Sequence, residues 1–509
     1  MHVETLLRNS AAASPERIAV TDGEMRLSYG VLDDNSDRLA SFLLARGVQR
    51  GDRVVIFMEN IWETTVAIFA VLKAGAVFCP VNPSLKVDGL RFVLGDCRPS
   101  AVLTQAKYAR LCQEAGGDMP HSPIIVAARG DAGIPTVLAF EECLAEGPGR
   151  LPDAGTDDDL AMIIYTSGST GKAKGVMMSH GNVLAASGSI ATYLENTAKD
   201  VILGVLPLSF TYGLYQLLVA VRVGARLVLQ KNFAFPHVVL AAARREGVTG
   251  LPLVPTMAAM ILCLKDLEPL PALRYITSAA AALPTAHVSG LKGQFPDVRL
   301  YLMYGLTECA RATFLLPEEV DRRPDSAGKA IPGTEVLVVD EAGCPLAAGA
   351  VGELIVRGPH VMQGYWENPA ATDAALRPGP KPGERWLHTG DLFRTDADGF
   401  LYFVGRKDDI VKVRGEKVAL SQVEAALHAC SGVVAAVVVG VPDPVLGTTL
   451  RAAVVASDPA LTERDILRHC AGILPENMMP KTVEFRAELP LTASGKVSRR
   501  LVMEAGEKK

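Results

Sequence analysis

Apolar positions along the chain alternate between the spacing of amphipathic helices and the continuous runs of buried strands. Residues 27–47 carry four apolar side chains on one helical face, and the β-branched run at 52–58 predicts a buried strand. The pattern at 65–75 predicts the next helix, and short strands are predicted at 201–208 and 225–230. Because helices and strands alternate in this way, we expect layered α/β structure with largely parallel sheets.

The pattern changes between Ser326 and Phe403, where glycine and proline recur every few residues. The apolar stretches in this region, such as 335–340 and 352–358, are short and are bounded by turn residues. This texture predicts a small antiparallel, β-barrel-like subdomain that closes the large N-terminal part of the chain.

A compact α+β unit is predicted after the sequence "GRKDD" at 405–409. Ser421 and Glu424 have the spacing of a capping box at the start of its first helix. We therefore divide the chain into a large N-terminal domain, 1–405, and a small C-terminal domain, 406–509, which has an ordinary domain size. The elements expected in the second domain are helices at 421–429 and 463–472 and strands at 433–441 and 450–456.

Composition narrows the class of protein. The 509 residues are too many for one compact core, and 49% hydrophobic with 21% charged residues is typical of a globular chain. A formal charge of −5 without a long basic run argues against a nucleic-acid-binding protein. The nine cysteines have no metal-type spacing, the N-terminus does not fit a secretion signal, and the longest apolar run cannot span a membrane. We expect a reduced, cytoplasmic protein, either a monomer or a homodimer.

The stretch "YTSGSTGKAKG" at Tyr165–Gly175 has the composition of a phosphate-binding loop. It does not fit the Walker A pattern, because only two residues separate Gly168 from Gly171 and Ala173 stands where that pattern requires a hydroxyl. A strand predicted at 160–166 leads directly into the stretch. It is therefore either a phosphate loop of another kind or a flexible Gly/Ser linker.

Together with this loop, five further segments occur in an order that resembles the motif series of the adenylate-forming family. That family includes acyl-CoA synthetases, the adenylation domains of peptide synthetases and firefly-type luciferases. The resemblance extends from about Leu27 to Arg500, and the ordered series is far more specific than any single motif. The segments are "YGLTE" (304–308), "GYW" (364–366), "HTGDL" (388–392), "GRKDDIVKVRGEKV" (405–418) and "PLTASGKVSRR" (490–500).

The resemblance implies an enzyme that activates a carboxylic acid. The carboxylate attacks the α-phosphate of ATP to give acyl-AMP and pyrophosphate, and a second nucleophile, often the thiol of coenzyme A, then takes the acyl group. Because one anion attacks another, charge neutralisation and alignment supply most of the catalysis. The implied cofactors are ATP, Mg²⁺ and coenzyme A, and the implied fold includes a mobile C-terminal lid.

The resemblance also assigns roles around the nucleotide. Tyr304 is expected near the adenine, Asp391 and Arg406 at the ribose, Thr307 near the α-phosphate, and Glu308 as the Mg²⁺ ligand, because a hard cation prefers a carboxylate. Taken alone, Glu308 also fits a capped helix start and Asp391 an ordinary turn. The other expected nucleotide-binding residues, in the phosphate loop and in the segment "TSAAAALP" at 277–284, are Thr166, Ser167, Gly168, Ser169, Thr170, Gly171, Lys174, Ala280 and Ala281.

The C-terminal domain is expected to act as a lid with two positions. Lys496 resembles the family's catalytic lysine, which bridges the substrate carboxylate and the α-phosphate during adenylation. Asp408 stands at the expected hinge, and Lys412 and Gly415 lie on the loop that faces the site during the second half-reaction. One lid that serves two half-reactions is a conformational switch.

The acid pocket is expected to be apolar. Thr211 replaces the aspartate that pairs with the α-ammonium in peptide synthetases, so an α-amino acid is disfavoured, and Phe210 replaces a histidine of many acyl-CoA ligases. We expect an aromatic or bulky hydrophobic carboxylic acid. The expected lining residues are Phe210, Tyr212, Met257, Met260, Ala280, Met303, Gly305, Ala310 and Thr313.

Three functional hypotheses follow. The first is an acyl- or aryl-CoA ligase. The second is an enzyme that passes the acyl group to an amine or to a carrier-protein pantetheine, and the sequence does not separate it from the first. The third is a non-catalytic nucleotide-binding homologue, which the joint presence of Lys496, Glu308, Asp391 and Arg406 disfavours.

Overall fold

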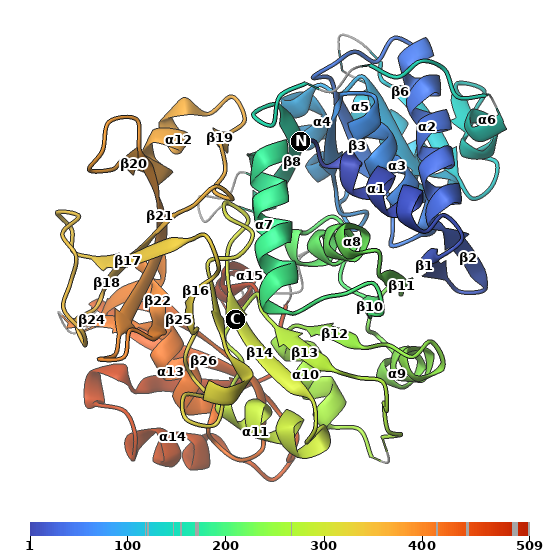
Figure 1. Cartoon of the computed structure of the whole chain (residues 1–509). Helices are drawn as coiled ribbons and strands as arrows, with labels where there is room; N and C mark the ends of the chain where they lie inside the picture. Colours follow the sequence, from blue (N-terminus) through green and yellow to red (C-terminus); the bar gives the residue numbers. More distant parts are fainter. Residues whose placement is uncertain are drawn as a thin grey trace.

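The computed structural model describes residues 1–117, 119, 122–145, 147–152, 155–167, 173–265, 267–413, 416–443, 447–490 and 497–506. Three large sheets with flanking helices form the N-terminal part of the chain, and two small sheets with three helices follow them (Figure 1). The α/β class expected from the alternating pattern is confirmed.

The first sheet has eight strands, most of them parallel. From edge to edge they are β19 (Gly364–Tyr365), β9 (Ala173–Ser179), β8 (Leu160–Ser167), β4 (Val77–Pro80), β3 (Arg53–Phe57), β5 (Ala101–Gln105), β6 (Ile124–Ala128) and β7 (Val137–Ala139). The flanking helices are α2 (Tyr29–Ala45), α3 (Trp62–Lys73), α4 (Val87–Cys97), η1 (Ala106–Tyr108), α5 (Ala109–Gly116) and α6 (Phe140–Ala145). Val54 and Ile56 pack in one core with α2 and α3, whereas Val55 and Phe57 pack in another with α4 and α5. The strand is buried on both faces, which explains its unbroken apolar run.

The second sheet has nine strands, and its central pairs are parallel. In order they are β16 (Lys329–Ala330), β15 (Thr313–Leu315), β14 (Arg299–Tyr304), β13 (Tyr275–Ser278), β12 (Gly250–Leu253), β10 (Val201–Gly204), β11 (Arg226–Leu229), β1 (Ile18–Asp22) and β2 (Met25–Ser28). Its helices are α1 (Glu4–Ala13), α7 (His180–Tyr193), α8 (Thr211–Val223), α9 (Pro236–Arg245), α10 (Pro255–Leu262), α11 (Thr285–Gln294) and η2 (Pro317–Glu319). Helices α7 and α8 lie between the first two sheets, which share one hydrophobic core (Figure 1).

The third sheet is antiparallel, as the short strands predicted, but it is not a closed barrel. Its strands are β17 (Glu335–Val339), β18 (Gly352–Arg357), β21 (Arg385–Thr395) and β20 (Leu376–Pro378), with β22 (Leu401–Arg406) also paired to β21. Helix α12 (Pro369–Ala375) precedes β20. Within the described residues β17 pairs along its length only with β18, so the sheet stays open at this edge and the barrel-like subdomain is not a closed barrel.

The C-terminal part forms a small α+β unit with its own core. Its elements are η3 (Lys407–Asp409), β23 (Ile410–Val413), β24 (Glu416–Ala419), α13 (Leu420–His428), β25 (Val433–Asp443), β26 (Gly447–Ala456), α14 (Glu463–Ala471), η4 (Glu476–Met478), β27 (Pro480–Phe485) and α15 (Arg499–Gly506). The expected capping box was wrong, because Ala419 is the N-cap of α13. The Ser421 hydroxyl instead donates to Val404 O at 2.5 Å, and the Glu424 carboxylate accepts from Val438 N at 2.9 Å.

Two further sequence expectations concern cross-links and membranes. No disulfide joins the nine cysteines, all of which lie within the described residues. Of the helices that the structure describes, none combines the length and the apolar character needed to cross a bilayer.

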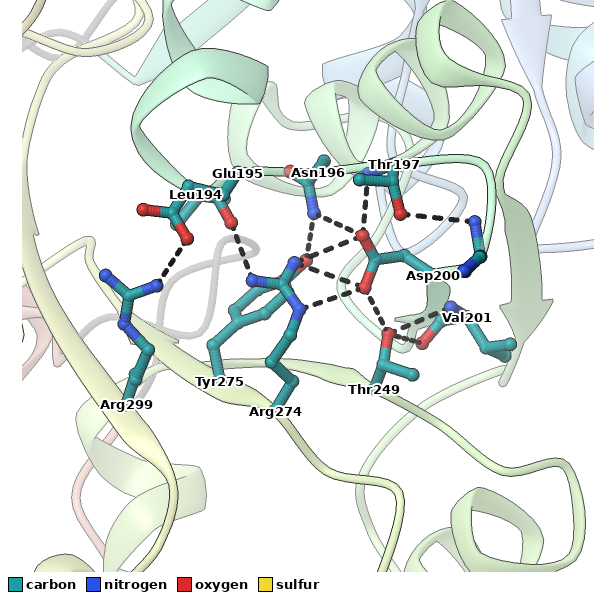
Figure 2. A network of polar contacts seen from close by, with 11 residues as sticks. Leu194, Glu195, Asn196, Thr197, Asp200, Val201, Thr249, Arg274, Tyr275 and Arg299 are labelled. Carbon is teal, nitrogen blue, oxygen red and sulfur yellow. Dashed lines mark hydrogen bonds and ion pairs between the residues drawn. The ribbon is translucent and has the colours of Figure 1, made fainter.

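Buried polar contacts tie together the ends at which three parallel strands of the second sheet begin (Figure 2). Asp200, just before β10, accepts from Arg274 Nη2 at 3.1 Å and from Thr249 Oγ1 at 2.8 Å, and these residues precede β13 and β12. Arg274 Nη1 also donates to Leu194 O at 2.9 Å, after α7. The network therefore holds together the amino ends of these strands. The carboxyl ends of the strands lie at the opposite end of the sheet, where ligands bind in open α/β sheets.

Candidate active site

The hairpin of β8 and β9 carries the ends of the predicted phosphate loop. Its register pairs Thr166 with Lys174, so these two residues flank the hairpin tip. Gly175 follows on β9, where an added Cβ would lie 2.7 Å from Ile163 Cγ2. Ser167 is the last residue of β8, and the structure describes its backbone. The predicted loop residues Gly168, Ser169, Thr170 and Gly171 lie outside the described residues.

Tyr365 connects this hairpin to the segment after β14. Its strand β19 pairs with β9, and the Lys174 ammonium lies 5.2 Å from the centroid of the Tyr365 ring. The Tyr365 hydroxyl donates to Glu308 Oε1 at 2.8 Å, while Met362 N donates to Glu308 O at 2.8 Å. Burial, followed by the Glu308 charge, raises the pKa of Tyr365, so the phenol stays protonated and donates. Three motifs that are far apart in sequence thus meet at one place.

A second cluster joins Tyr304, Asp391 and Arg406. The Tyr304 hydroxyl donates to Asp391 Oδ2 at 2.6 Å, and Arg406 Nε lies 3.0 Å from Asp391 Oδ1. Asp391 and Arg406 face each other in the register of β21 and β22, and the Tyr304 ring packs edge-on against Phe393 at 4.8 Å. Burial and then the Asp391 charge raise the pKa of Tyr304 well above its ordinary value. The carboxylate is therefore oriented by a neutral donor on one side and a cation on the other.

Glu353, on β18, holds the irregular part of strand β21 that carries Asp391. Its Oε1 accepts from Gly390 N at 3.0 Å, and its Oε2 lies 2.7 Å from Lys407 Nζ and 3.0 Å from His388 Nδ1. Burial opposes ionisation, yet the hydrogen bonds from His388 and Lys407 lower the pKa of Glu353 to about 2. Gly390 has a φ of +72°, a conformation that glycine adopts without strain. The part of β21 around Asp391 is thus held by a buried carboxylate.

The alanine-rich segment after β13 is irregular and not the helix start that alanine composition alone would favour. Ala280 has a φ of +78°, which is uncommon for a residue with a Cβ, and α11 begins only at Thr285. Ala280 is half-buried, and Ala281 is exposed. The segment follows Ser278 at the carboxyl end of β13, on the same edge of the sheet as Tyr304 at the end of β14.

Several expected acid-pocket residues lie in one buried region between α8 and the end of β14. The Tyr212 hydroxyl contacts Thr277 O at 3.0 Å and Thr277 Oγ1 at 2.8 Å, and its ring stacks with the Arg311 guanidinium at 4.5 Å. Ala310, next to Arg311, is 1% exposed, and an added Cβ on Gly305 would lie 2.6 Å from Ala310 O. The pocket segment therefore packs tightly against the end of the strand.

Other expected lining residues differ in their surroundings. Met257 and Met303 are buried, and Met303 Sδ accepts from the Tyr193 hydroxyl at 3.0 Å. Thr313 is buried with its hydroxyl already donated to Ala327 O at 2.6 Å. Phe210 is half-buried at the N-cap of α8. Met260 was expected in the lining but is 37% exposed on α10, because it lies on the side of this short helix that faces away from the core.

The lid residues are only partly described. Asp408 lies in η3 and Lys412 in β23, and the structure describes the backbone of both. Gly415 and Lys496 lie outside the described residues. Their predicted roles in the hinge, the second half-reaction and the adenylation step stay predictions.

The described residues fit a nucleotide with a divalent cation. Glu308 is partly exposed, its Oε1 is held by the Tyr365 hydroxyl, and no lysine or arginine among the described residues lies within ion-pairing distance of it. A carboxylate without a protein cation is suited to Mg²⁺. Thr307 is also partly exposed beside it, and Lys174 supplies a positive charge on the far side of Tyr365. The arrangement can hold phosphates and a ribose at the same edge of the sheets.

The contacts that Tyr365, Glu353 and Arg311 make in the site were not predicted from the sequence. Tyr365 occurs in the motif "GYW" and Glu353 in the strand "GELIVRG", but neither pattern indicates a partner. Arg311 lies three residues after the end of the motif "YGLTE", and its burial could not be predicted from the neighbouring residues in the sequence.

Comparisons with known proteins agree with this site. The AMP-binding enzyme family model matches residues 7–366, and the AMP-binding enzyme C-terminal domain model matches residues 422–496. A long-chain-fatty-acid–CoA ligase of Salmonella typhimurium is 32% identical over 518 residues, which cover 94% of this chain and 90% of the relative. A solved anthranilate CoA ligase in complex with anthranoyl-AMP has a TM-score of 0.91 at 26% identity and covers 99% of this chain and 97% of its own. The o-succinylbenzoate coenzyme A synthetase of Bacillus subtilis with ATP and a magnesium ion has a TM-score of 0.85 at 27% identity and covers 98% and 99%.

Proposed function

The chain belongs to the AMP-binding enzyme family, and we propose that it is an acid–thiol ligase that forms an acyl adenylate from ATP and transfers the acyl group to coenzyme A. The observation that carries this proposal is the meeting of Lys174, Tyr365 and Glu308 beside the cluster of Tyr304, Asp391 and Arg406. Relatives that are named CoA ligases match nearly the whole chain. The proposal therefore includes both adenylate formation and acyl transfer to coenzyme A.

In the first half-reaction the protein positions the α-phosphate for attack by the acid. Asp391 accepts hydrogen bonds from the ribose hydroxyls, with its carboxylate oriented by Tyr304 and Arg406. Lys174 and the loop at 168–172 hold the phosphates that leave as pyrophosphate, and Thr307 lies near the α-phosphate. Preorganised charges of this kind stabilise the transition state without moving during the reaction.

Glu308 is the residue that would hold Mg²⁺. When it is bound, the ion neutralises phosphate charge and so lowers the repulsion that the attacking carboxylate meets. The Tyr365 hydroxyl fixes one Glu308 oxygen at 2.8 Å and leaves the remaining lone pairs for the ion.

The lid supplies the remaining chemistry. We propose that the domain boundary lies between 405 and 406, at the end of β22, and that Asp408 is the hinge. Lys496 would bridge the substrate carboxylate and the α-phosphate during adenylation, and the loop with Lys412 and Gly415 would face the site during transfer to the thiol.

The acid is proposed to be aromatic or bulky and largely hydrophobic. Support comes from the buried Tyr212, Met257, Met303 and Ala310, which offer apolar and aromatic contacts. A solved neighbour is named an anthranilate CoA ligase, whereas a relative in sequence is named a long-chain-fatty-acid ligase, so the body of the acid can be a ring or a chain.

The test is a panel of acids with ATP and Mg²⁺, each offered coenzyme A, an amine or no acceptor, with pyrophosphate release and product mass measured. We expect acid-dependent pyrophosphate release, and a thioester mass only with coenzyme A. An amide as the main product would refute the acceptor, and the absence of pyrophosphate release with every acid would refute the enzyme.

A pair of variants tests whether Asp391 binds the ribose of the nucleotide. Asp391→Asn should raise the KM for ATP, because the carboxylate that accepts the ribose hydroxyls loses its charge. Asp398→Asn is the matched control, since its side chain is 65% exposed and pairs with Arg323. An unchanged KM for ATP in Asp391→Asn would contradict the ribose assignment.

A further inference from the structure

Arg311 is a buried arginine without an anionic partner. The residue is 5% exposed, its Nη1 donates to the backbone oxygen of Ala310 at 2.7 Å, and its buried Nε has no hydrogen-bond partner among the described residues. No carboxylate in the described part of the chain lies within 4 Å of this guanidinium. Because arginine stays protonated in proteins, its charge must be met by something else or remain uncompensated. An uncompensated buried charge is strongly unfavourable, and burial of such a charge is rarely tolerated without a purpose.

The groups around the guanidinium are neutral phenols. Its carbon atom Cζ lies 4.5 Å from the centroid of the Tyr212 ring, whose hydroxyl is already engaged with Thr277. Burial raises the pKa of Tyr212 to about 12, and it also raises the pKa of Tyr193 and Tyr215, while the Arg311 charge opposes each rise. All three phenols therefore stay protonated and none supplies a negative charge.

One of these phenols also lacks a partner. The Tyr215 hydroxyl is buried and forms no hydrogen bond with any described residue. A phenol can both donate and accept a hydrogen bond, but it carries no charge, so a phenol alone leaves the guanidinium charge uncompensated. A planar carboxylate is the acceptor for which a guanidinium is best shaped, because two N–H groups can donate to its two oxygens.

These groups lie in the region that is proposed to receive the acid. Tyr212 and Ala310 both belong to the proposed pocket, and Arg311 follows Ala310 directly on the chain. The backbone holds the arginine in place, because Arg311 N donates to Cys309 O at 2.6 Å and Ala310 has a φ of +57°. The guanidinium itself is held beside residues of the proposed pocket by its hydrogen bond to Ala310 O and its stacking on Tyr212.

The reacting carboxylate loses its charge when it becomes an acyl adenylate and would then leave the buried cation uncompensated, whereas an anionic group that does not react stays paired with it. We propose that Arg311 is the specificity-determining residue of the acid pocket and binds a second carboxylate of the substrate, so that the acid activated here is a dicarboxylic acid. This inference rests on the proposed function and narrows its substrate class. The apolar and aromatic residues around Arg311 then contact the body of the acid between its two carboxylates.

The test compares acids that differ only in the second carboxylate, such as hexanoate with hexanedioate and phenylacetate with 1,4-phenylenediacetate. The kcat/KM of thioester formation is measured for each member of a pair with ATP, Mg²⁺ and coenzyme A. We expect the protein to prefer the dicarboxylate of at least one pair by about a hundredfold, since a site with buried polar groups rejects an analogue that leaves them unpaired.

Arg311→Met should remove that preference. Arg311→Lys should keep part of the preference, because it keeps the charge but not the two-pronged geometry. Arg322→Met is the matched control, since its side chain is 69% exposed. A thermal-shift arm without turnover should show that the dicarboxylate raises the Tm of the unsubstituted protein but not that of Arg311→Met.

Several outcomes would contradict this inference. The inference is overturned if the monocarboxylates are preferred by the unsubstituted protein in every pair. It is also overturned if Arg311→Met and Arg311→Lys lose both members of a pair equally, because the arginine would then hold the reacting carboxylate or the fold. A protein that releases pyrophosphate with monocarboxylates alone refutes this inference and leaves the proposed function standing, whereas a protein that activates no acid refutes the proposed function itself.

Discussion

Replacement of Glu353 by glutamine should separate the part that its charge plays from the part that its shape plays. The buried carboxylate accepts from Gly390 N at 3.0 Å and binds Lys407 and His388. Its pKa falls from an ordinary 4.5 to about 2, despite burial. At 1.36 kcal/mol per pH unit, this fall is equivalent to about 3 kcal/mol. The Lys407 side chain is 42% exposed, so solvent screening reduces the expected contribution to about 2 kcal/mol.

The sign of the pH dependence follows from the lowered pKa. The unfolded carboxyl binds a proton below pH 4.5, whereas the folded one binds it only near pH 2. The stabilising contribution is therefore complete above pH 4.5 and is lost as the pH falls towards 2. Glu353→Gln should lower the free energy of unfolding by about 2 kcal/mol at pH 7, and this difference should shrink steadily below pH 4.5.

Urea unfolding at a series of pH values measures this difference, and the KM for ATP shows whether the part of β21 that carries Asp391 has moved. Glu335→Gln on the adjacent strand β17 is the control, since its side chain is 59% exposed, and should change stability by less than about 0.5 kcal/mol. A Glu353→Gln protein whose loss of stability is the same at pH 3 as at pH 7 would show that packing, and not the ionised carboxylate, stabilises this part of β21.

Three other substitutions follow, two in the site and one in the Asp200 network at the opposite end of the strands. Tyr365→Phe keeps the ring beside Lys174 but removes the hydrogen bond to Glu308, so kcat/KM should fall roughly ten- to a hundredfold with little change in Tm, and an unchanged kcat/KM would contradict this contact. Lys496→Ala should abolish acid-dependent pyrophosphate exchange but still convert a supplied acyl adenylate, and equal loss of both steps would refute the lid assignment. Asp200→Ala leaves Arg274 without its carboxylate and should lower the free energy of unfolding by about 3 kcal/mol in urea titrations, while the ratio of kcat/KM values for two acids stays the same.

The sequence predicted the class of fold and most elements because these depend on local patterns of apolar residues. The strand expected at 52–58 is β3, and the helix expected at 463–472 is α14. Whether the antiparallel sheet closes could not be predicted from the sequence. Closure depends on the tilt and stagger of the strands, which the pattern of apolar residues does not show. The capping box failed for a related reason, because Ser421 and Glu424 found partners in Val404 and Val438.

The motifs of the candidate site were predicted from the sequence, but the contacts between their residues were not. Asp391 and Arg406 were both expected at the ribose, yet their direct pairing follows from the register of β21 and β22, which the sequence does not state. Tyr365 reaches Glu308 across two sheets. The guanidinium of Arg311 could not be anticipated, since burial of a charged side chain is decided by tertiary packing alone.

The position of the Asp200 network has a bearing on how this enzyme can change. The network ties the strands together at the edge where they begin, and the residues proposed to touch the substrates lie at the edge where they end. Mutations that remodel the acid pocket therefore leave the anchoring end intact, and their stability effects should add to those at Asp200 without coupling. A chain built in this way can change the residues of its acid pocket while the other ends of the strands stay anchored to one another.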